Sequence, residues 1–321
     1  MNNMYLWIVL VGGIFSFFTS AGIGANDAAN AFATSVGSKA LTIKQATILA
    51  AIFETSGAIL MGNHVTNTIR KGIANHECFD GSEYILMYGC MWVIFSVGIW
   101  LFFASYLEMP VSTTHSCVGG MIGMAWLLKG FDCVIWVQYT DTFPYISGVS
   151  GIVLSWVLSP LFSCILSALL YYILRRYVLR HEFHTKRINF TYPVLTGFTI
   201  MINVFFITYK GAKGIGLDDT PFYLAFIIAV LSGGTCAFPT YVFISRVKAP
   251  IESIPHTDTH TIEMKYINND KEFNKVNDIH KNAEQFDPKI EDMFKYLQIF
   301  SAICDSFSHG ANDVANAIGP L

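Results

Sequence analysis

The chain of 321 residues is 53% hydrophobic and only 13% charged, about half the charged fraction of a typical soluble domain. Several apolar runs exceed the roughly 18 residues that a helix needs to cross a bilayer, so the composition excludes a soluble protein. The net charge of −3 excludes little, because membrane proteins sort their charges by the side of the membrane. We therefore predict an all-α polytopic membrane protein.

The first predicted span, Tyr5–Ile23, leads directly into a polar octapeptide, Gly24–Ala31. Because no basic residue precedes the apolar run, we interpret it as a retained membrane helix rather than a signal peptide. The octapeptide returns at Gly310–Ala317 with seven of its eight residues identical, 286 positions later. Polar side chains are costly in hydrocarbon, so two such clusters beside apolar runs predict a functional site.

Each copy of the octapeptide places an aspartate among asparagines at helical spacing. Asn26, Asp27 and Asn30 can share one face of a helix, and the alanines between them allow a neighbouring backbone to approach closely. The second copy offers Asp313 and Asn316 in the same way. This pattern predicts a site in the packed interior rather than a lipid-facing surface.

The second predicted span, Leu41–Gly62, carries a carboxylate, Glu54, near its middle. An unpartnered carboxylate at that depth costs about 2.5–3.5 kcal/mol, so Glu54 must face a cavity or a counter-charge. Facing a cavity would make it a candidate ion ligand. The alternative is a structural ion pair with a basic residue such as Arg70.

The third predicted span, Tyr84–Leu107, is uncharged and is followed by the polar stretch Pro110–Ser116. Proline favours the first turn of a helix and serine and threonine are favoured caps, so a helix is predicted to begin here. It would direct backbone N–H groups and the hydroxyls of Ser112, Thr113 and Thr114 at one point, as anion sites do. The alternative is a plain helix cap with two unused hydroxyls.

The rest of the chain alternates apolar runs with charged segments. The run Phe143–Leu174 has no charge over 32 positions, and we expect Pro160 to divide it. Two further spans are predicted at 193–209 and 221–245. The segment 246–292 has 7 Lys or Arg, 10 Asp or Glu and few aromatic residues, which predicts a mostly disordered loop before a last apolar run.

The seven cysteines are scattered and odd in number. Five of them lie inside apolar segments. Their spacing matches neither a zinc site nor a disulfide framework, so we expect them to act as small packing residues.

Basic residues predict which loops face the cytoplasm. Arg175, Arg176, Arg180 and two further basic residues crowd the loop after the long apolar run, and the segment 246–292 holds another group, whereas the loop between them has only two lysines. Basic loops favour the cytoplasmic side, so we predict a cytoplasmic 246–292 loop and an N-terminus outside the cell.

The number of crossings decides how the two octapeptides are oriented. If 110–128 crosses the membrane and 143–174 crosses once, seven crossings separate the copies, which then run antiparallel, as in inverted repeats that bind substrate near the midplane. If 110–128 and 143–157 form a re-entrant hairpin, six crossings separate the copies, which then run parallel. We predict an inverted-repeat secondary transporter with broken or re-entrant helices near 110–157.

Several stretches in order resemble the inorganic phosphate transporter (PiT) family of sodium- or proton-coupled phosphate symporters. They are the two octapeptides, Ile52–Gly57, Thr68–Ile73 and Pro110–His115. The similarity is dense over about the first 125 residues, looser through the middle, and returns at Ser306–Leu321. Members of the family carry a complete second repeat. The resemblance thus implies a first membrane repeat with following spans (1–245), the charged loop (246–292) and the start of a second, truncated repeat (293–321), as in a fragment of a longer transporter.

The resemblance implies that the protein is a transporter and not an enzyme. Such a transporter carries phosphate together with sodium across the cell membrane by alternating access. Coupling to protons is the alternative within the family. The partners that it implies are phosphate, sodium and the lipid bilayer, with a homodimer left open and no nucleic acid. No cofactor is expected besides the coupling ions.

The predicted phosphate ligands are Asp27, Asn30, Ser112, Thr113, Thr114, Asp313 and Asn316. The predicted sodium ligands are oxygen atoms of Asn26, Asp27, Glu54, Asn312 and Asp313. The candidates for a proton-linked role are His115 and His309, although a lone interior histidine such as His115 is more often a satisfied structural residue. Since these motifs contain no lysine or arginine, co-bound cations would offset the charge of phosphate, and each ligand would raise the affinity for the other.

Two other classes of protein fit the sequence less well. A channel would need a continuous polar lining, whereas the polar residues cluster at two or three points. An enzyme acting on phosphate esters would need a nucleophile–base pair or a metal cluster, and the only candidate is His115 beside the hydroxyls of 112–116 in one helix.

Overall fold

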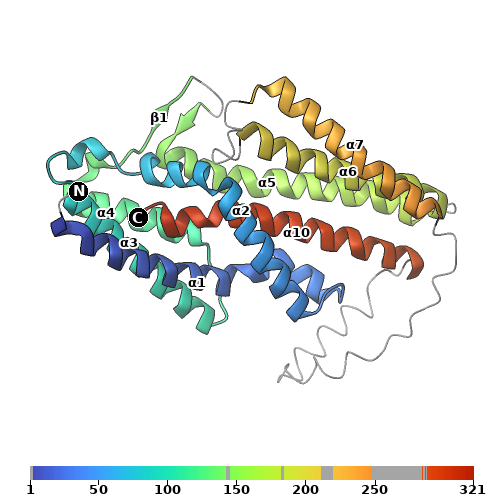
Figure 1. Cartoon of the computed structure of the whole chain (residues 1–321), viewed down its shortest axis with the longest axis horizontal. Helices are drawn as coiled ribbons and strands as arrows, with labels where there is room; N and C mark the ends of the chain where they lie inside the picture. The colour runs from blue at the N-terminus through green and yellow to red at the C-terminus, as the bar shows by residue number, and fades with distance from the viewer. Residues whose placement is uncertain are drawn as a thin grey trace.

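The computed structural model describes residues 3–141, 145–181, 184–210, 220–246, 284, 286 and 288–321. The long helices are α1 (Leu6–Gly37), α2 (Ile43–Gly72), α3 (Glu83–Tyr106), α4 (Thr113–Lys129), α5 (Gly148–Leu174), α6 (His184–Lys210), α7 (Phe222–Arg246) and α10 (Pro288–Ile318). The short elements are η1 (Asn3–Tyr5), η2 (His76–Phe79), η3 (Phe131–Cys133), the π-helical turn η4 (Arg175–Leu179), and the hairpin of β1 (Gln138–Tyr139) and β2 (Ile146–Ser147). Together they form an elongated helical bundle (Figure 1).

The protein is a helical membrane protein, as predicted. Within the described residues, six helices are long and apolar enough to cross a bilayer: α1, α2, α3, α5, α6 and α7. The helix α4 has 17 residues and falls just short of that length. The predicted loop 246–292 lies mostly outside the described residues, but α10 already begins at Pro288.

The helices α1 and α3 run parallel, and α4 folds back along α3. The rings of Phe15 and Phe95 lie 4.4 Å apart, and the hydroxyl of Thr19 donates to the carbonyl of Ile94. The ammonium of Lys129, the last residue of α4, donates to Ser82, which precedes α3. The segment after α3 therefore returns to the end of the bundle at which α3 began.

The helix α10 packs against both α1 and α2, near the middle of the bundle (Figure 1). It is antiparallel to α1, because Ser16 donates to the carbonyl of Ala317 and Gln298 donates to the carbonyl of Thr34. The two copies of the octapeptide therefore run in opposite directions, as expected if 110–128 returns across the membrane. The inverted repeat as a whole stays a prediction.

Glycine permits the close approach of α10 to α2. A Cβ added at Gly310 would lie 2.1 Å from the carbonyl oxygen of Glu54, and one at Gly57 would lie 1.9 Å from the carbonyl oxygen of Phe307. Small residues at such crossings let helix backbones meet in a membrane, where lipid supplies no hydrophobic drive. This crossing fixes the position of the second octapeptide along the axis of α2.

Pro160 does not divide the long apolar run, contrary to the prediction. It lies inside α5, which continues without a break from Gly148 to Leu174 and into η4. Membrane helices tolerate proline because neighbouring groups and small local adjustments satisfy the freed carbonyl. The prolines Pro193 and Pro239 lie inside α6 and α7 in the same way.

The prediction that the cysteines are packing residues is wrong for two of them. Cys78 in η2 forms a disulfide with Cys133 in η3 and so ties the α2–α3 loop to the α4–α5 loop. The backbone N–H of Asn75 also donates to the carbonyl of Cys133. A pair separated by 55 positions leaves no local spacing signal, which explains why the sequence did not reveal it.

Candidate functional site

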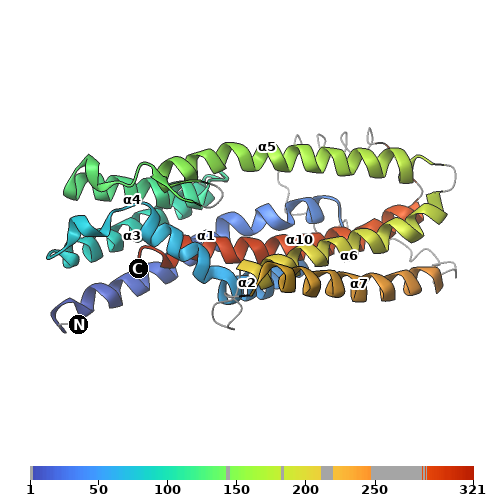
Figure 2. The same ribbon diagram turned by 90° about the horizontal axis from the view of Figure 1, so that it is seen from above.

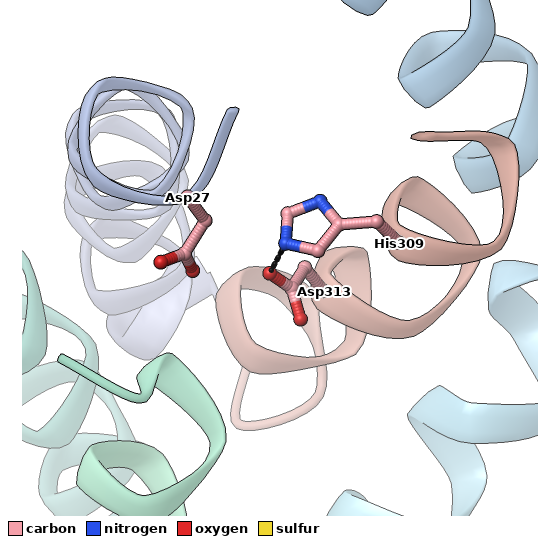
Figure 3. A group of neighbouring side chains, drawn as sticks. All are labelled: Asp27, His309 and Asp313. Carbon is pink, nitrogen blue, oxygen red and sulfur yellow. Dashed lines mark ion pairs between the residues drawn. The ribbon is translucent and has the colours of Figure 1, made fainter. Parts of the chain in front are cut away.

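A pocket of about 370 Å³ lies where α1, α10 and the start of α4 meet. It is lined by Asp27, Asn30, Pro110, Val111, Ser112, Thr113, Thr114, His309, Asn312 and Asp313. Figure 3 shows Asp27 projecting from α1 toward His309 and Asp313 on α10. The two octapeptides, which are far apart in the sequence, thus contribute to one site.

Asp27 is buried and held by two donors. The hydroxyl of Thr113 donates to its Oδ2 at 2.5 Å, and the amide of Asn30, one turn later, lies 3.4 Å from its Oδ1. The first contact joins α1 to the first residue of α4. A buried carboxylate needs such donors, because an unpaired charge away from water is costly.

Asp313 has the matching environment on α10. The amide of Asn316 donates to its Oδ1 at 3.3 Å, as Asn30 does for Asp27, and the amide of the adjacent Asn312 lies 3.4 Å from the same oxygen. The other amide hydrogen of Asn316 is directed at Thr114 Oγ1, 3.1 Å away. Asn316 does not line the pocket, but it fixes Asp313 to the start of α4.

His309 joins the second octapeptide to α2. Its Nε2 lies 2.8 Å from Asp313 Oδ2 (Figure 3). Its Nδ1 lies 3.4 Å from Glu54 Oε1 without forming a hydrogen bond. The partner of Glu54 is therefore this histidine and not Arg70. Glu54 itself lies behind His309 and does not line the pocket.

The start of α4 has the predicted cap. Ser112 is the N-cap residue, and its hydroxyl oxygen accepts from the backbone N–H of His115 at 3.2 Å. Each of the three hydroxyls has a partner: Ser112 contacts the His115 ring, Thr113 contacts Asp27, and Thr114 accepts from Asn316. All three residues also line the pocket, and each hydroxyl has a partner, so the alternative of two unused hydroxyls does not describe this cap.

His115 lies outside the pocket lining. Its ring stacks on Trp156 of α5 with 3.6 Å between ring centroids, and its Nδ1 lies 2.5 Å from Ser112 Oγ. These contacts match a satisfied structural histidine, which was the simpler interpretation of the sequence. His309 is the histidine that the fold brings to the two aspartates.

Asn26 also lies outside the pocket lining, although it was predicted as a sodium ligand. Its amide nitrogen donates to Ser105 Oγ at 3.2 Å and to the carbonyl of Met109 at 3.0 Å. Its amide oxygen accepts from the backbone N–H of Val111 at 3.2 Å. Asn26 therefore holds the linker that delivers the 112–114 hydroxyls, and its geometry is that of a positioning residue.

We expect Asn26→Ala to leave the linker unsupported and to lower the stability of the protein. The loss of three hydrogen bonds at a part-buried site should cost about 1–3 kcal/mol. Thermal unfolding in detergent measures the effect. The matched control is Asn203→Ala, because the amide of Asn203 donates only within its own helix, to Thr199. Equal behaviour of the two variants would contradict this role.

The charged side chains of the pocket favour the binding of cations, and an anion could bind there only together with a cation. Its lining contains two aspartates and one histidine, and no lysine or arginine among the described residues. One ligand atom each from Asp27, His309 and Asp313 lie within 4.8 Å of one another, close enough to share an ion. Carboxylate and amide oxygens suit hard cations, and an anion held by the hydroxyls would need such a cation beside it.

The chain is similar in sequence to known phosphate transporters. The model of the family described as "Phosphate transporter family" matches residues 23–321. Sodium-dependent phosphate transporter 1 of Rattus norvegicus is 37% identical over 248 residues, which cover 77% of this chain and 35% of the rat protein. Inorganic phosphate transporter 2-1, chloroplastic, of Arabidopsis thaliana is 34% identical over 309 residues, which cover 96% of this chain and 49% of that protein.

A solved structure agrees with the sequence relatives. The structure titled "The sodium-dependent phosphate transporter" superposes with a TM-score of 0.75 at 30% identity, over 98% of this chain and 66% of the other. This chain thus spans from about a third to two thirds of the length of these relatives.

Proposed function

Because the chain belongs to the phosphate transporter family, we propose that the protein carries inorganic phosphate across a membrane together with sodium, by alternating access. The observation that carries this proposal is the pocket between the two octapeptides. Two aspartates from antiparallel helices meet there beside the hydroxyls of Ser112, Thr113 and Thr114. The site thus combines anion-binding groups and cation-binding groups within one cavity.

Phosphate binds, in this proposal, at the start of α4. The hydroxyls of 112–114 and the free N–H groups of the first turn are donors for its oxygens, and the helix dipole favours negative charge there. The amides of Asn30 and Asn316 hold the aspartates in place. The absence of lysine and arginine from the described lining suits a ligand that must also be released, since bidentate arginine contacts bind phosphate more tightly.

Sodium binds between the aspartates and phosphate. The oxygens of Asp27, Asp313 and Asn312 supply hard ligands at the pocket wall. A phosphate dianion beside two unneutralised carboxylates would be repelled, so sodium must enter for phosphate to stay. Linkage then requires that phosphate raises the affinity for sodium by the same factor.

Two observations support a proposed direction of the fold in the membrane. Tyr5 stacks on Tyr84 at 5.5 Å, so the N-terminus lies at the same end as the loops joined by the Cys78–Cys133 disulfide. Disulfides persist in oxidising compartments, so we place this end outside the cytoplasm. The arginines that follow α5 lie at the other end, which we place in the cytoplasm, with the cell membrane as the host membrane.

We expect uptake of radiolabelled phosphate to stop when choline replaces sodium at constant pH. Sodium is the only cation in this exchange that fits small oxygen-lined sites, because choline is too large to be coordinated. Initial rates in cells or proteoliposomes measure the effect, with an imposed pH gradient as the second arm. Uptake that persists in choline and follows the pH gradient would contradict sodium coupling.

Proton coupling is the second candidate, and His309 favours it. Its ring lies between Asp313 and Glu54, which places three titratable groups of α2 and α10 next to one another. The sodium–choline exchange decides between the two candidates, since only proton coupling predicts uptake that is driven by a pH gradient alone. Sodium remains our proposal, because the two pocket aspartates and neighbouring amides offer oxygen ligands in greater number.

A further inference from the structure

A second group of charged residues lies at the far end of the bundle, away from the pocket. Arg175, Arg176 and Arg180 lie in and directly after the π-helical turn that ends α5. Lys186 and Arg187 follow at the start of α6. Apart from Arg175, which is part-exposed, these basic side chains are exposed. Beneath them Val178 and Ile188 are buried against Met293 and Phe294 of α10, so the group is fixed to three helices.

Two of the arginines already hold a carboxylate. Glu284 accepts from Arg180 Nε at 2.6 Å and from Arg175 Nε at 2.7 Å. The hydrogen bonds from Arg180 and Arg175 lower the pKa of Glu284, so it is charged at neutral pH. The geometry is that of an oxyanion clamped by two guanidinium groups, an arrangement that also suits phosphate oxygens. The partners are 33–47% exposed, which leaves this position accessible to a competing anion.

The surroundings of the arginines are those of a membrane surface. In the most apolar window of α5 and η4 no residue is buried, and Figure 2 shows α5 along the outer side of the bundle. Tyr171, Tyr172 and Tyr177 are exposed at the same level as the arginines. Exposed tyrosines beside basic residues at the end of an apolar helix mark the level of lipid headgroups.

We propose that Arg175, Arg176 and Arg180 bind the headgroup of an anionic phospholipid, in competition with Glu284. The phosphodiester takes the place of the carboxylate between Arg175 and Arg180, and its acyl chains lie along the exposed apolar side of α5. Arg176 is exposed and has no partner among the described residues, so it is available to a second headgroup oxygen. This inference does not depend on the identity of the transported ion.

The test is competition between lipids for the protein purified in neutral detergent. Native mass spectrometry counts bound phosphatidylglycerol and phosphatidylcholine after both are added at equal concentration. We expect preferential binding of phosphatidylglycerol, roughly 30-fold weaker in the Arg175→Gln/Arg180→Gln variant. Arg176→Gln should weaken it several-fold without disturbing the Glu284 contacts, and Glu284→Gln should strengthen it. A further arm adds inorganic phosphate in excess, which should not displace the lipid.

The matched control is Arg70→Gln/Lys71→Gln, which removes two positive charges at the opposite end of the bundle and should leave the preference unchanged. Equal binding of the two lipids would overturn the proposal. So would an equal loss in the control variant, which would indicate a general charge effect, or displacement by inorganic phosphate, which would indicate a site for the free anion.

Discussion

Replacing Asp27 with asparagine is expected to abolish sodium-driven phosphate uptake while leaving the protein in the membrane. The amide keeps the shape of the side chain and an oxygen that can accept from Thr113, so the contact between α1 and α4 can survive. The charge that would hold sodium is lost. Removal of one charge from a buried, hydrogen-bonded set costs about 2–5 kcal/mol, which corresponds to a loss of about 30-fold or more.

The measurement is uptake of radiolabelled phosphate, normalised to the amount of protein at the membrane. Asp132→Asn is the control, because Asp132 lies in η3, is exposed and does not line the pocket. The control should transport normally. Unchanged uptake in the Asp27 variant would remove this residue from the site and with it the proposed role of the octapeptide.

The second large effect is expected from Gly310→Ala, which should destabilise the crossing of α2 and α10. The new Cβ would meet the carbonyl oxygen of Glu54 at 2.1 Å and its Cα at 2.5 Å. These are backbone atoms and cannot turn away as a side chain could, so the helices must separate. Overpacking of this kind costs about 1–3 kcal/mol or more, and it would also move Asp313 away from Asp27.

Thermal unfolding should therefore show a midpoint lower by at least about 3–5 °C, and uptake should fall with it. The control is Gly234→Ala, at an exposed glycine of α7 where an added Cβ meets nothing within 4 Å. An unchanged midpoint and unchanged uptake for Gly310→Ala would show that the close approach of α10 to α2 is not needed.

The sequence predicted the elements whose signals are local. The length of the apolar runs predicted the membrane helices, and the proline, serine and threonine residues of 110–116 predicted the start of α4. The repeated octapeptide marked Asp27 and Asp313 as candidate site residues, and the resemblance to the phosphate transporter family implied that they belong to one site; both line the pocket. Apart from that resemblance, these predictions needed only spacing and the cost of polar groups in hydrocarbon.

Contacts between segments that are distant in the sequence could not be predicted. The Cys78–Cys133 disulfide and the approach of His309 to Glu54 join residues whose separation carries no periodic signal. Pro160 was misjudged for a different reason, because a rule that holds for soluble helices is weaker in a membrane.

Identical residues can also have different surroundings in the two octapeptides. Gly24 and Gly310 occupy the same motif position, but an added Cβ meets nothing within 4 Å at Gly24 and would strike Glu54 at Gly310. The asparagine at Asn26 likewise supports the linker before α4, whereas its counterpart Asn312 lines the pocket. Motif identity therefore predicted the location of the site but not the role of each residue.

The central claim, that phosphate and sodium share the pocket between the two octapeptides, is tested most directly by equilibrium binding of radiolabelled phosphate to the purified protein. We predict saturable binding in sodium chloride that is lost in choline chloride at the same pH and ionic strength, and that is lost in sodium chloride for Asp27→Asn. Equal phosphate affinity in the two salts, or unaltered binding by the Asp27 variant, would contradict the account.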